Sequence, residues 1–142
     1  MIRIAAAAAA LLLSAAPALA QSADSKVVLT FETGARTGMV MVALYDTAAA
    51  FDGASARPVA ATAVPASGRQ VVATFENLPA GDYAVKAFHD VNGDGEMNTN
   101  PFGMPVEPYA FSNNAVGNMG PARWSAAHFA VSGETTQTIS IR

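Results

Sequence analysis

The chain of 142 residues contains no cysteine. This absence excludes disulfide bonds, thiolate metal sites and a lipid attached to a processed N-terminal cysteine. The sequence also lacks a cluster of basic residues, so nucleic acid is not an expected partner. No apolar run reaches the roughly 20 residues that span a bilayer, and no cationic amphipathic helix is present. We therefore expect no membrane insertion of the mature chain.

The first twenty residues have the pattern of a secretory signal peptide. Arg3 supplies a positive start, an apolar stretch follows from Ile4 to Leu13, and Ala18-Leu19-Ala20 matches the small-x-small cleavage pattern. We expect residues 1–20 to be cleaved before Gln21, and the protein to be exported to the periplasm or the extracellular medium.

Residues 21–142 have the length of one domain and carry no linker that would divide them. Loss of Arg3 leaves seven Lys and Arg against eleven Asp and Glu, a net charge of −4 with His neutral. We expect a single, mildly acidic domain.

Motifs for nucleophilic catalysis are also missing: there is no Gly-x-Ser-x-Gly and no Ser-x-x-Lys, and Ser112 has no base near it in sequence. The only histidines are His89 and His128, too few for a zinc site without further ligands. Because neighbouring strand residues point to opposite faces, His89 and Asp90 should diverge. We expect His89 to be structural, bonded to a loop at a strand end.

Short alternating stretches account for most of the remaining chain. Val27, Leu29 and Phe31 share one face of the first stretch, a period typical of a half-buried strand. Similar stretches separated by Gly, Pro and Asn turns predict about seven strands and no long helix. They cover residues 26–33, 39–45, 58–64, 71–76, 83–88, 127–131 and 138–141. The pattern favours an all-β, antiparallel two-sheet sandwich of immunoglobulin-like or transthyretin-like kind, with a small barrel as the alternative.

Residues 91–126 are too long for a simple connection, and long loops in compact domains are usually functional or disordered. Their aromatic residues argue against disorder. We expect one long ordered loop, packed down on the sandwich by Phe102, Tyr109, Phe111 and Trp124.

The start of this loop carries the spacing of a calcium loop. Asp90, Asn92 and Asp94 stand at positions one, three and five, Gly95 at six, the Glu96 carbonyl at seven and Asn98 at nine. Ca²⁺ prefers such alternating oxygens, but position twelve, where a bidentate Glu belongs, is Pro101. The pattern predicts a weak Ca²⁺ site with a dissociation constant of roughly 10⁻⁴–10⁻³ M. The alternative is an Asn/Gly/Asp turn that binds only its own backbone.

Several of these stretches together resemble the bacterial family known as domain of unknown function 2141. They are Leu78 to Val85, Phe88 to Asn100, Phe102 to Pro105, Tyr109 to Asn114, and Gly120-Pro121. The resemblance covers most of the mature chain and implies an exported β-sandwich without an assigned activity. The family's loop commonly has Asp near the place where this chain has Asn98.

Taken together, these patterns favour a binding or structural module of the bacterial envelope over an enzyme. Its partner would be an envelope component or a small ligand, contacted by a long loop that Ca²⁺ makes rigid. One alternative is a hydrolase of envelope polymers that uses the loop carboxylates, among them Asp90, Asp94, Glu96 and Glu107. Another is a carrier that holds a small apolar ligand in a cavity of roughly 300 Å³ or more between the sheets.

Overall fold

The computed structural model describes residues 24–34, 37–53 and 57–142. The expected signal peptide and the cleavage position before Gln21 lie outside these residues. Strands make up 48% of the described residues and helices 11%, so the expected all-β class is confirmed. Within the described residues, no helix is long and apolar enough to cross a membrane.

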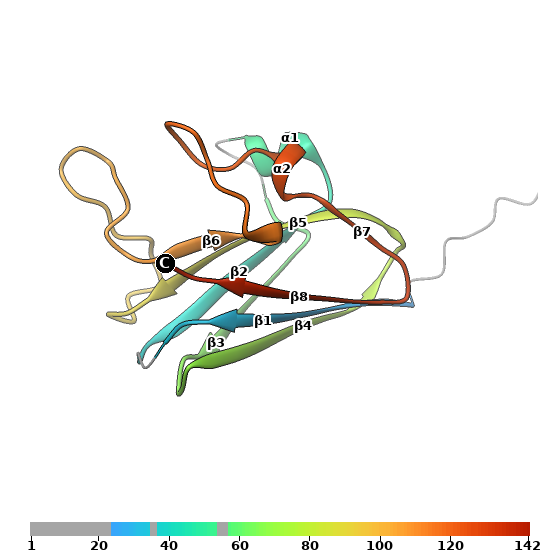
Figure 1. The fold of residues 1–142 in the computed structure, drawn as a ribbon, viewed down its shortest axis with the longest axis horizontal. Coiled ribbons are helices and arrows are strands. Elements are labelled where there is room, and N and C mark those ends of the chain that lie inside the picture. Colours follow the sequence, from blue (N-terminus) through green and yellow to red (C-terminus); the bar gives the residue numbers. More distant parts are fainter. Residues whose placement is uncertain (1–23, 35–36, 54–56) are drawn as a thin grey trace, which may run out of the picture.

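Eight strands form two sheets, as Figure 1 shows. The three-stranded sheet has the order β4-β1-β8, and the five-stranded sheet has the order β3-β2-β5-β6, with β7 paired to β5. The bounds are β1 Ser25–Glu32, β2 Met39–Tyr45, β3 Ala60–Pro65, β4 Gln70–Leu78, β5 Gly81–Asp90, β6 Tyr109–Phe111, β7 Phe129–Val131 and β8 Glu134–Ser140. Three short helices are α1 Ala48–Asp52, η1 Ser112–Asn114 and α2 Trp124–Ala127.

The expectation of purely antiparallel sheets is wrong for one pair. β1 pairs with β4 antiparallel but with β8 parallel, from Lys26 opposite Glu134 to Glu32 opposite Ser140. β7 first pairs with β5 of the five-stranded sheet, and β8 then continues beside β1 of the other sheet. Because β8 reaches β1 by this route and not by a hairpin, antiparallel direction is not imposed on the pair.

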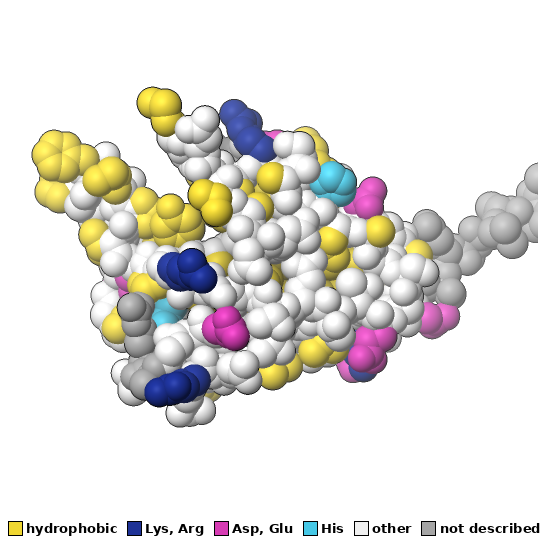
Figure 2. Space-filling model, viewed as in Figure 1, with side chains coloured by type: hydrophobic (Ala, Val, Ile, Leu, Met, Phe, Trp, Pro, Cys, Tyr) yellow, Lys and Arg dark blue, Asp and Glu magenta, His cyan; other side chains and the backbone are white. Residues whose placement is uncertain are grey.

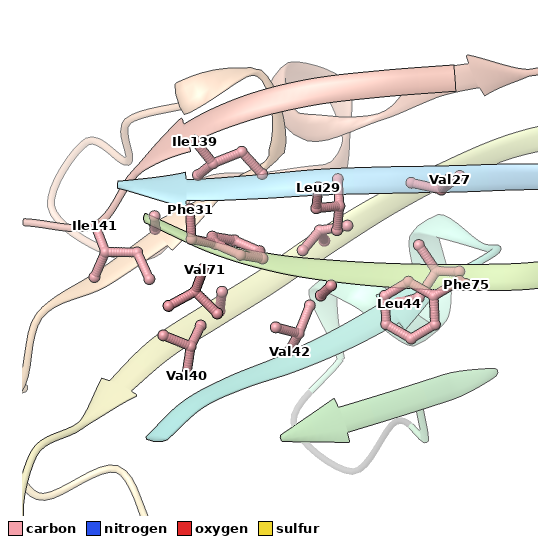
Figure 3. Packing of buried hydrophobic residues seen from close by; sticks show 14 of the residues in the cluster. Val27, Leu29, Phe31, Val40, Val42, Leu44, Val71, Phe75, Ile139 and Ile141 are labelled. Carbon is pink, nitrogen blue, oxygen red and sulfur yellow. The ribbon is translucent and has the colours of Figure 1, made fainter. Parts of the chain in front are cut away.

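The main core lies between the two sheets (Figure 3). The alternating residues of β1 that were expected on one face, Val27, Leu29 and Phe31, are all fully buried. They pack with Val40, Val42 and Leu44 of β2 and with Ile139 of β8. The period-two pattern therefore assigned the buried face of these strands correctly.

A second, smaller cluster lies on the outer face of the five-stranded sheet. Phe51 of α1 is 1% exposed and meets the rings of Tyr45, Phe111 and Trp124 at centroid distances of 5.6 to 6.2 Å. The Lys86 ammonium lies over the Tyr45 and Phe51 rings and donates to the Phe51 carbonyl at 2.5 Å. Burial lowers the pKa of Lys86. This cluster fixes α1 and α2 on the sheet.

The expected single loop over residues 91–126 is divided in the structure. β6 pairs with β5, from Lys86 opposite Phe111 to Phe88 opposite Tyr109, so residues 91–108 form a hairpin connection that we name the β5–β6 loop. Residues 115–123, between η1 and α2, form a second loop that we name the η1–α2 loop. Both loops project in the same direction in Figure 1.

Candidate functional site

Asp90, the last residue of β5, forms the foot of the β5–β6 loop. Its carboxylate is buried, with 1% of the residue exposed. Oδ1 accepts a hydrogen bond from the Gly93 amide at 2.7 Å, and Oδ2 accepts one from the Gly95 amide at 2.8 Å. Both glycines have positive φ, 75° and 80°, which side-chain-bearing residues adopt only with strain. The sequence Asp-x-x-Gly-x-Gly thus folds the loop start around a single carboxylate.

Glu107 closes the loop from its other end. Only 7% of the residue is exposed, Oε1 accepts from the Val91 amide at 2.9 Å, and Oε2 accepts from the Asn98 amide at 3.1 Å. From the sequence, Glu107 was named only among the loop carboxylates that a hydrolase could use. Its partners are 16 and 9 residues away, so no local pattern could have revealed this role.

Two of the predicted calcium ligands, Asn92 and Asn98, converge on the carboxylate of a third, Asp94. The Asp94 Oδ2 accepts from the side-chain amide of Asn92 at 3.1 Å and from that of Asn98 at 2.8 Å. The Asn92 amide also donates to the Asn98 Oδ1 at 2.9 Å. The side-chain hydrogen bond from Asn98, followed by the backbone hydrogen bond from Glu96, lowers the pKa of Asp94 below its ordinary value. These bonds make Asp94 the centre of the loop's polar cluster.

The other two predicted ligands are placed differently. Both oxygens of Asp90 face the backbone amides described above, and Glu96 joins the cluster through its own amide, which donates to the Asp94 Oδ1 at 2.9 Å. Among the described residues, no group of three or more His, Cys, Asp or Glu side chains is arranged to hold a metal. These side-chain to backbone hydrogen bonds are those of the Asx turn that was the alternative to an ion site.

The donor set nevertheless fits a hard cation in its chemistry. Each carboxylate has about four lone-pair sites on its two oxygens. The hydrogen bonds that Asp90 and Asp94 accept from amides therefore leave lone pairs free for a cation. A half-turn of the Asn92 and Asn98 side-chain amides would present their oxygens in place of their NH₂ groups. The oxygen donors of the calcium-like spacing are thus the side chains of Asp90, Asn92, Asp94 and Asn98 and the Glu96 backbone carbonyl.

The apex of the β5–β6 loop is a small hairpin of its own. Asn100 Oδ1 accepts from the amides of Phe102 and Met104 at 2.9 and 3.0 Å, and the Asn100 amide donates to the Met104 carbonyl at 2.8 Å. A bridge between Thr99 and Pro105 extends this ladder. The apex holds its side chains away from the sheets: Phe102 is 89% exposed, and Met104 and Val106 are also exposed.

The expectation that the aromatic residues all pack down on the sandwich is therefore partly wrong. Phe111 is buried and Trp124 is half-buried in the outer cluster, but Phe102 is exposed and Tyr109 is 42% exposed. The hairpin between β5 and β6 carries the apex of this loop beyond the ends of the two strands, and Phe102 belongs to neither apolar cluster of the described residues (Figure 1).

The η1–α2 loop is anchored by two asparagines. Asn113 donates through its side-chain amide to the carbonyls of Ala126 and His128, at 3.1 and 2.9 Å. Asn114 donates to the Thr138 carbonyl at 3.1 Å and accepts from the Ser140 amide at 2.8 Å, and so bonds to the edge of β8. Both residues have positive φ, 59° and 50°, a conformation that Asn tolerates better than most residues. The Asn-Asn pair thus positions the loop.

Two large apolar side chains project from this loop. Val116 is 87% exposed and the side chain of Met119 is fully exposed. A Cβ atom at Gly117 would overlap the Gly120 carbonyl oxygen, so the loop folds closely on itself. Figure 2 shows hydrophobic side chains at the ends of both projecting loops, with a hollow between them in that view.

The remaining candidates for catalysis are bound into the structure. His89 is fully buried, and its Nε2 lies 2.6 Å from the Thr37 carbonyl oxygen, consistent with the expected structural role. His128 is exposed, and its ring stacks on that of Trp124 with the ring centroids 5.6 Å apart. The buried Ser112 hydroxyl donates to the Ala127 carbonyl at 2.6 Å and accepts from the Val85 amide at 2.8 Å. All three have roles in holding segments together.

The two best-formed depressions among the described residues lie near the ends of β1, not between the sheets. One, of about 420 Å³, is lined by Lys26, Glu76, Asn77 and Glu134, among others. The other, of about 460 Å³, is lined by Glu32, Gly34, Arg69 and Gln70. Both are open to solvent and have charged side chains in their lining, which does not suit an apolar ligand.

Comparison with known proteins gives a family and no closer relative. No curated protein and no solved structure matched the chain. The family model described as "uncharacterized protein conserved in bacteria" (DUF2141) matches residues 32–140, from the end of β1 to the end of β8. This match includes both projecting loops and the strands that hold them. The chain therefore belongs to the DUF2141 family of bacterial proteins.

Proposed function

We propose that this protein is an exported, non-enzymatic binding module of the bacterial envelope that uses its two projecting loops as the recognition surface. The supporting observation is that hydrogen bonds hold the apex of the β5–β6 loop and the foot of the η1–α2 loop, while large apolar side chains of both loops are exposed. Asn100 fixes the apex that exposes Phe102, and Asn114 fixes the foot of the loop that exposes Met119. Exposed apolar side chains that gather on neighbouring loops suit an interaction site better than singly scattered ones do.

The proposal includes export after cleavage before Gln21 and a sandwich of immunoglobulin-like or transthyretin-like kind. The leader pattern supports export. Two sheets that face each other across one core support the sandwich. Sandwich domains commonly present binding loops at one end of the sheets, so the positions of these two loops agree with this use.

A binding role accounts for the polar groups of the β5–β6 loop better than hydrolysis does. A general acid or base must reach the substrate, whereas the Asp90 and Glu107 carboxylates are buried and accept backbone amides. Asp94 is exposed, but its Oδ2 is bonded to two asparagine side chains. These carboxylates act as supports of the loop.

The test compares retention of the mature protein on immobilised envelope fractions with that of a tip variant, Phe102→Ser combined with Met119→Ser. The control is Val59→Ser combined with Val72→Ser, because these side chains are apolar and exposed, at 49% and 54%, but lie outside both loops. We expect the tip variant alone to lose retention. Equal retention of all three proteins would contradict the proposal.

We further propose that Ca²⁺ binds weakly at the Asp94 cluster and makes the β5–β6 loop more rigid. The convergence of Asn92, Asp94 and Asn98 supports this proposal. At ten times its dissociation constant, an ion adds about 1.4 kcal/mol to the free energy of unfolding. For a domain of this size the melting temperature should rise by roughly 4–8 °C.

Thermal melts in EDTA and in millimolar Ca²⁺ measure this increment. Asp94→Ala should abolish it, whereas Asp82→Ala, an exposed carboxylate at the start of β5, should retain it. Coincident curves for the unmodified protein would show that the cluster is only a turn.

A further inference from the structure

The exposed apolar side chains of this protein are concentrated on its two loops. Nine large hydrophobic residues are exposed among the described residues, and six of them belong to these loops. Val91 lies at the foot of the β5–β6 loop. The other five are Phe102, Met104 and Val106 of the β5–β6 loop, and Val116 and Met119 of the η1–α2 loop. We name these five side chains the apolar tips.

The conformation of both loops keeps the tips exposed. Asn100 accepts two amides that fix the Phe102 apex, so the exposure of Phe102 follows from a defined hairpin. Met119 has φ of 56°, a conformation that costs free energy for a residue with a side chain, and its side chain contacts no core. Strain of this kind at an exposed apolar residue points to use of that residue in an interaction.

The segments that carry the apolar tips contain no charged residue. No charged residue occurs from Met97 to Val106 or from Ser112 to Ala122. The nearest acidic groups of the β5–β6 loop, Asp94, Glu96 and Glu107, lie toward its foot. Side chains at the tips could therefore leave water without the large cost of desolvating a charge.

We propose that the apolar tips dock the mature protein on the surface of a phospholipid bilayer, which deepens the proposed binding function and rests on it. Uncharged tips match the uncharged acyl region, and an amphipathic surface docks with its apolar part at the headgroup boundary. A fluid bilayer accepts separate projecting side chains without a complementary shape. A protein partner would instead need a fitted surface of roughly 800 Å² on each side.

The charge near the loops predicts which lipids are preferred. The exposed Asp94 and Glu96 toward the foot of the β5–β6 loop and the net charge of −4 repel anionic headgroups, and Arg123 is the one cation within the two loops. We therefore expect docking on zwitterionic phosphatidylcholine, and weaker docking as phosphatidylglycerol is added at low salt. This dependence is opposite to that of a basic membrane-binding helix.

The test is co-sedimentation of the mature protein with phosphatidylcholine vesicles, with and without phosphatidylglycerol. Phe102→Ser and Met119→Ser should each lower the partition coefficient by about tenfold, the factor that corresponds to 1.4 kcal/mol. Val59→Ser combined with Val72→Ser should leave it unchanged. Because all four side chains are exposed, the variants should keep the wild-type melting temperature, which is measured alongside.

A second measurement uses the absence of cysteine. Phe102→Cys carrying an environment-sensitive dye should show a blue-shifted emission when vesicles are added, whereas Thr136→Cys on exposed β8 should not. Absence of vesicle binding, or equal loss of binding in the Val59/Val72 control, overturns the proposal. Light scattering could instead show a dimer that Phe102→Ser converts to a monomer. The tips would then contact a second copy of the chain, and docking on lipid would be overturned.

The outcomes also separate this proposal from the binding function on which it rests. Tip-dependent retention on envelope fractions, without partition into pure vesicles, overturns docking on lipid but retains the binding function. Loss of both overturns both.

Discussion

Glu107 is the residue on which the conformation of the β5–β6 loop depends most. Its carboxylate bonds two backbone amides from the two ends of the calcium-like segment, Val91 and Asn98. Asp90 holds the interior of the same segment through Gly93 and Gly95. The two buried carboxylates thus accept hydrogen bonds from backbone amides that have no partner in a helix or strand. Backbone donors that are shielded from water nearly always have such an acceptor.

Replacing Glu107 with Ala should destabilise the protein by about 2 kcal/mol, because two partly buried amides lose their acceptor. Glu107→Gln should cost less, since one acceptor oxygen remains. Denaturant unfolding measures both changes, with Asp82→Ala as a control expected to stay within about 0.5 kcal/mol. A Glu107→Ala variant as stable as the control would show that water replaces the carboxylate.

Asp94 should have a lowered carboxyl pKa in the folded protein, chiefly because the Asn98 side-chain amide bonds to it. Its ionised form therefore supports the loop at pH values above its ordinary pKa of 3.8, and this support is lost as the pH falls through the lower, folded-state value. NMR titration of the carboxyl carbon measures that pKa. Asn98→Ala should move it back toward 3.8, and an unchanged value would exclude Asn98 as the main cause.

At the scale of elements, the turn between β1 and β2 supports the end of β5. Gly38 has φ of 101°, and a Cβ atom there would overlap the Asp90 carbonyl oxygen. The His89 ring bonds to the carbonyl of neighbouring Thr37. The turn therefore packs against the residues from which the β5–β6 loop begins, so the foot of the loop is fixed on both sides.

Gly38→Ala should destabilise the fold by more than about 2 kcal/mol, because positive φ and backbone overlap add together. The matched change is Gly68→Ala in the turn before β4, where φ is not positive and no atom lies within 4 Å of the added carbon. That change should be neutral or stabilise by about 0.5 kcal/mol. Thermal melts compare the two variants, and similar losses would show that Gly38 has no special role.

At the scale of the whole molecule, the last strand completes the core that the first strand begins. β8 lies parallel to β1, and its Ile139 is fully buried against residues of both sheets. The Lys26 ammonium and the Glu134 carboxylate meet at 2.6 Å at the start of this pair, with the hydrogen bond to Glu134 the main cause of a raised Lys26 pKa. Folding therefore requires contact between the two ends of the described chain.

Ile139→Ala should cost about 2–5 kcal/mol, the range for removal of a buried aliphatic side chain. This is a large fraction of the 5–15 kcal/mol that typically stabilises a domain, so the variant should melt well below the wild type. Thr136→Ala, exposed on the same strand, should change stability by about 0.5 kcal/mol or less. Comparable losses for the two variants would contradict the placement of β8 in the core.

Sequence by itself determined the fold class and most strands, because a half-buried strand repeats its environment every two residues. Val27, Leu29 and Phe31 show this, as do Tyr83, Val85 and Ala87, which alternate along the strand expected at residues 83–88 and are buried. It also located the polar cluster of Asn92, Asp94 and Asn98, since all its contacts lie within six residues along the chain. The DUF2141 assignment depends on the same local motifs.

Only the tertiary structure decided the roles that depend on distant segments. The parallel direction of β8, the strand β6 inside the expected long loop, and the bonds of Glu107 and Asn114 all join residues separated by many positions. The exposure of Phe102 was decided in the same way. An aromatic residue usually packs inward, but here the hairpin extends beyond the ends of its two strands and leaves Phe102 outside both apolar clusters of the described residues.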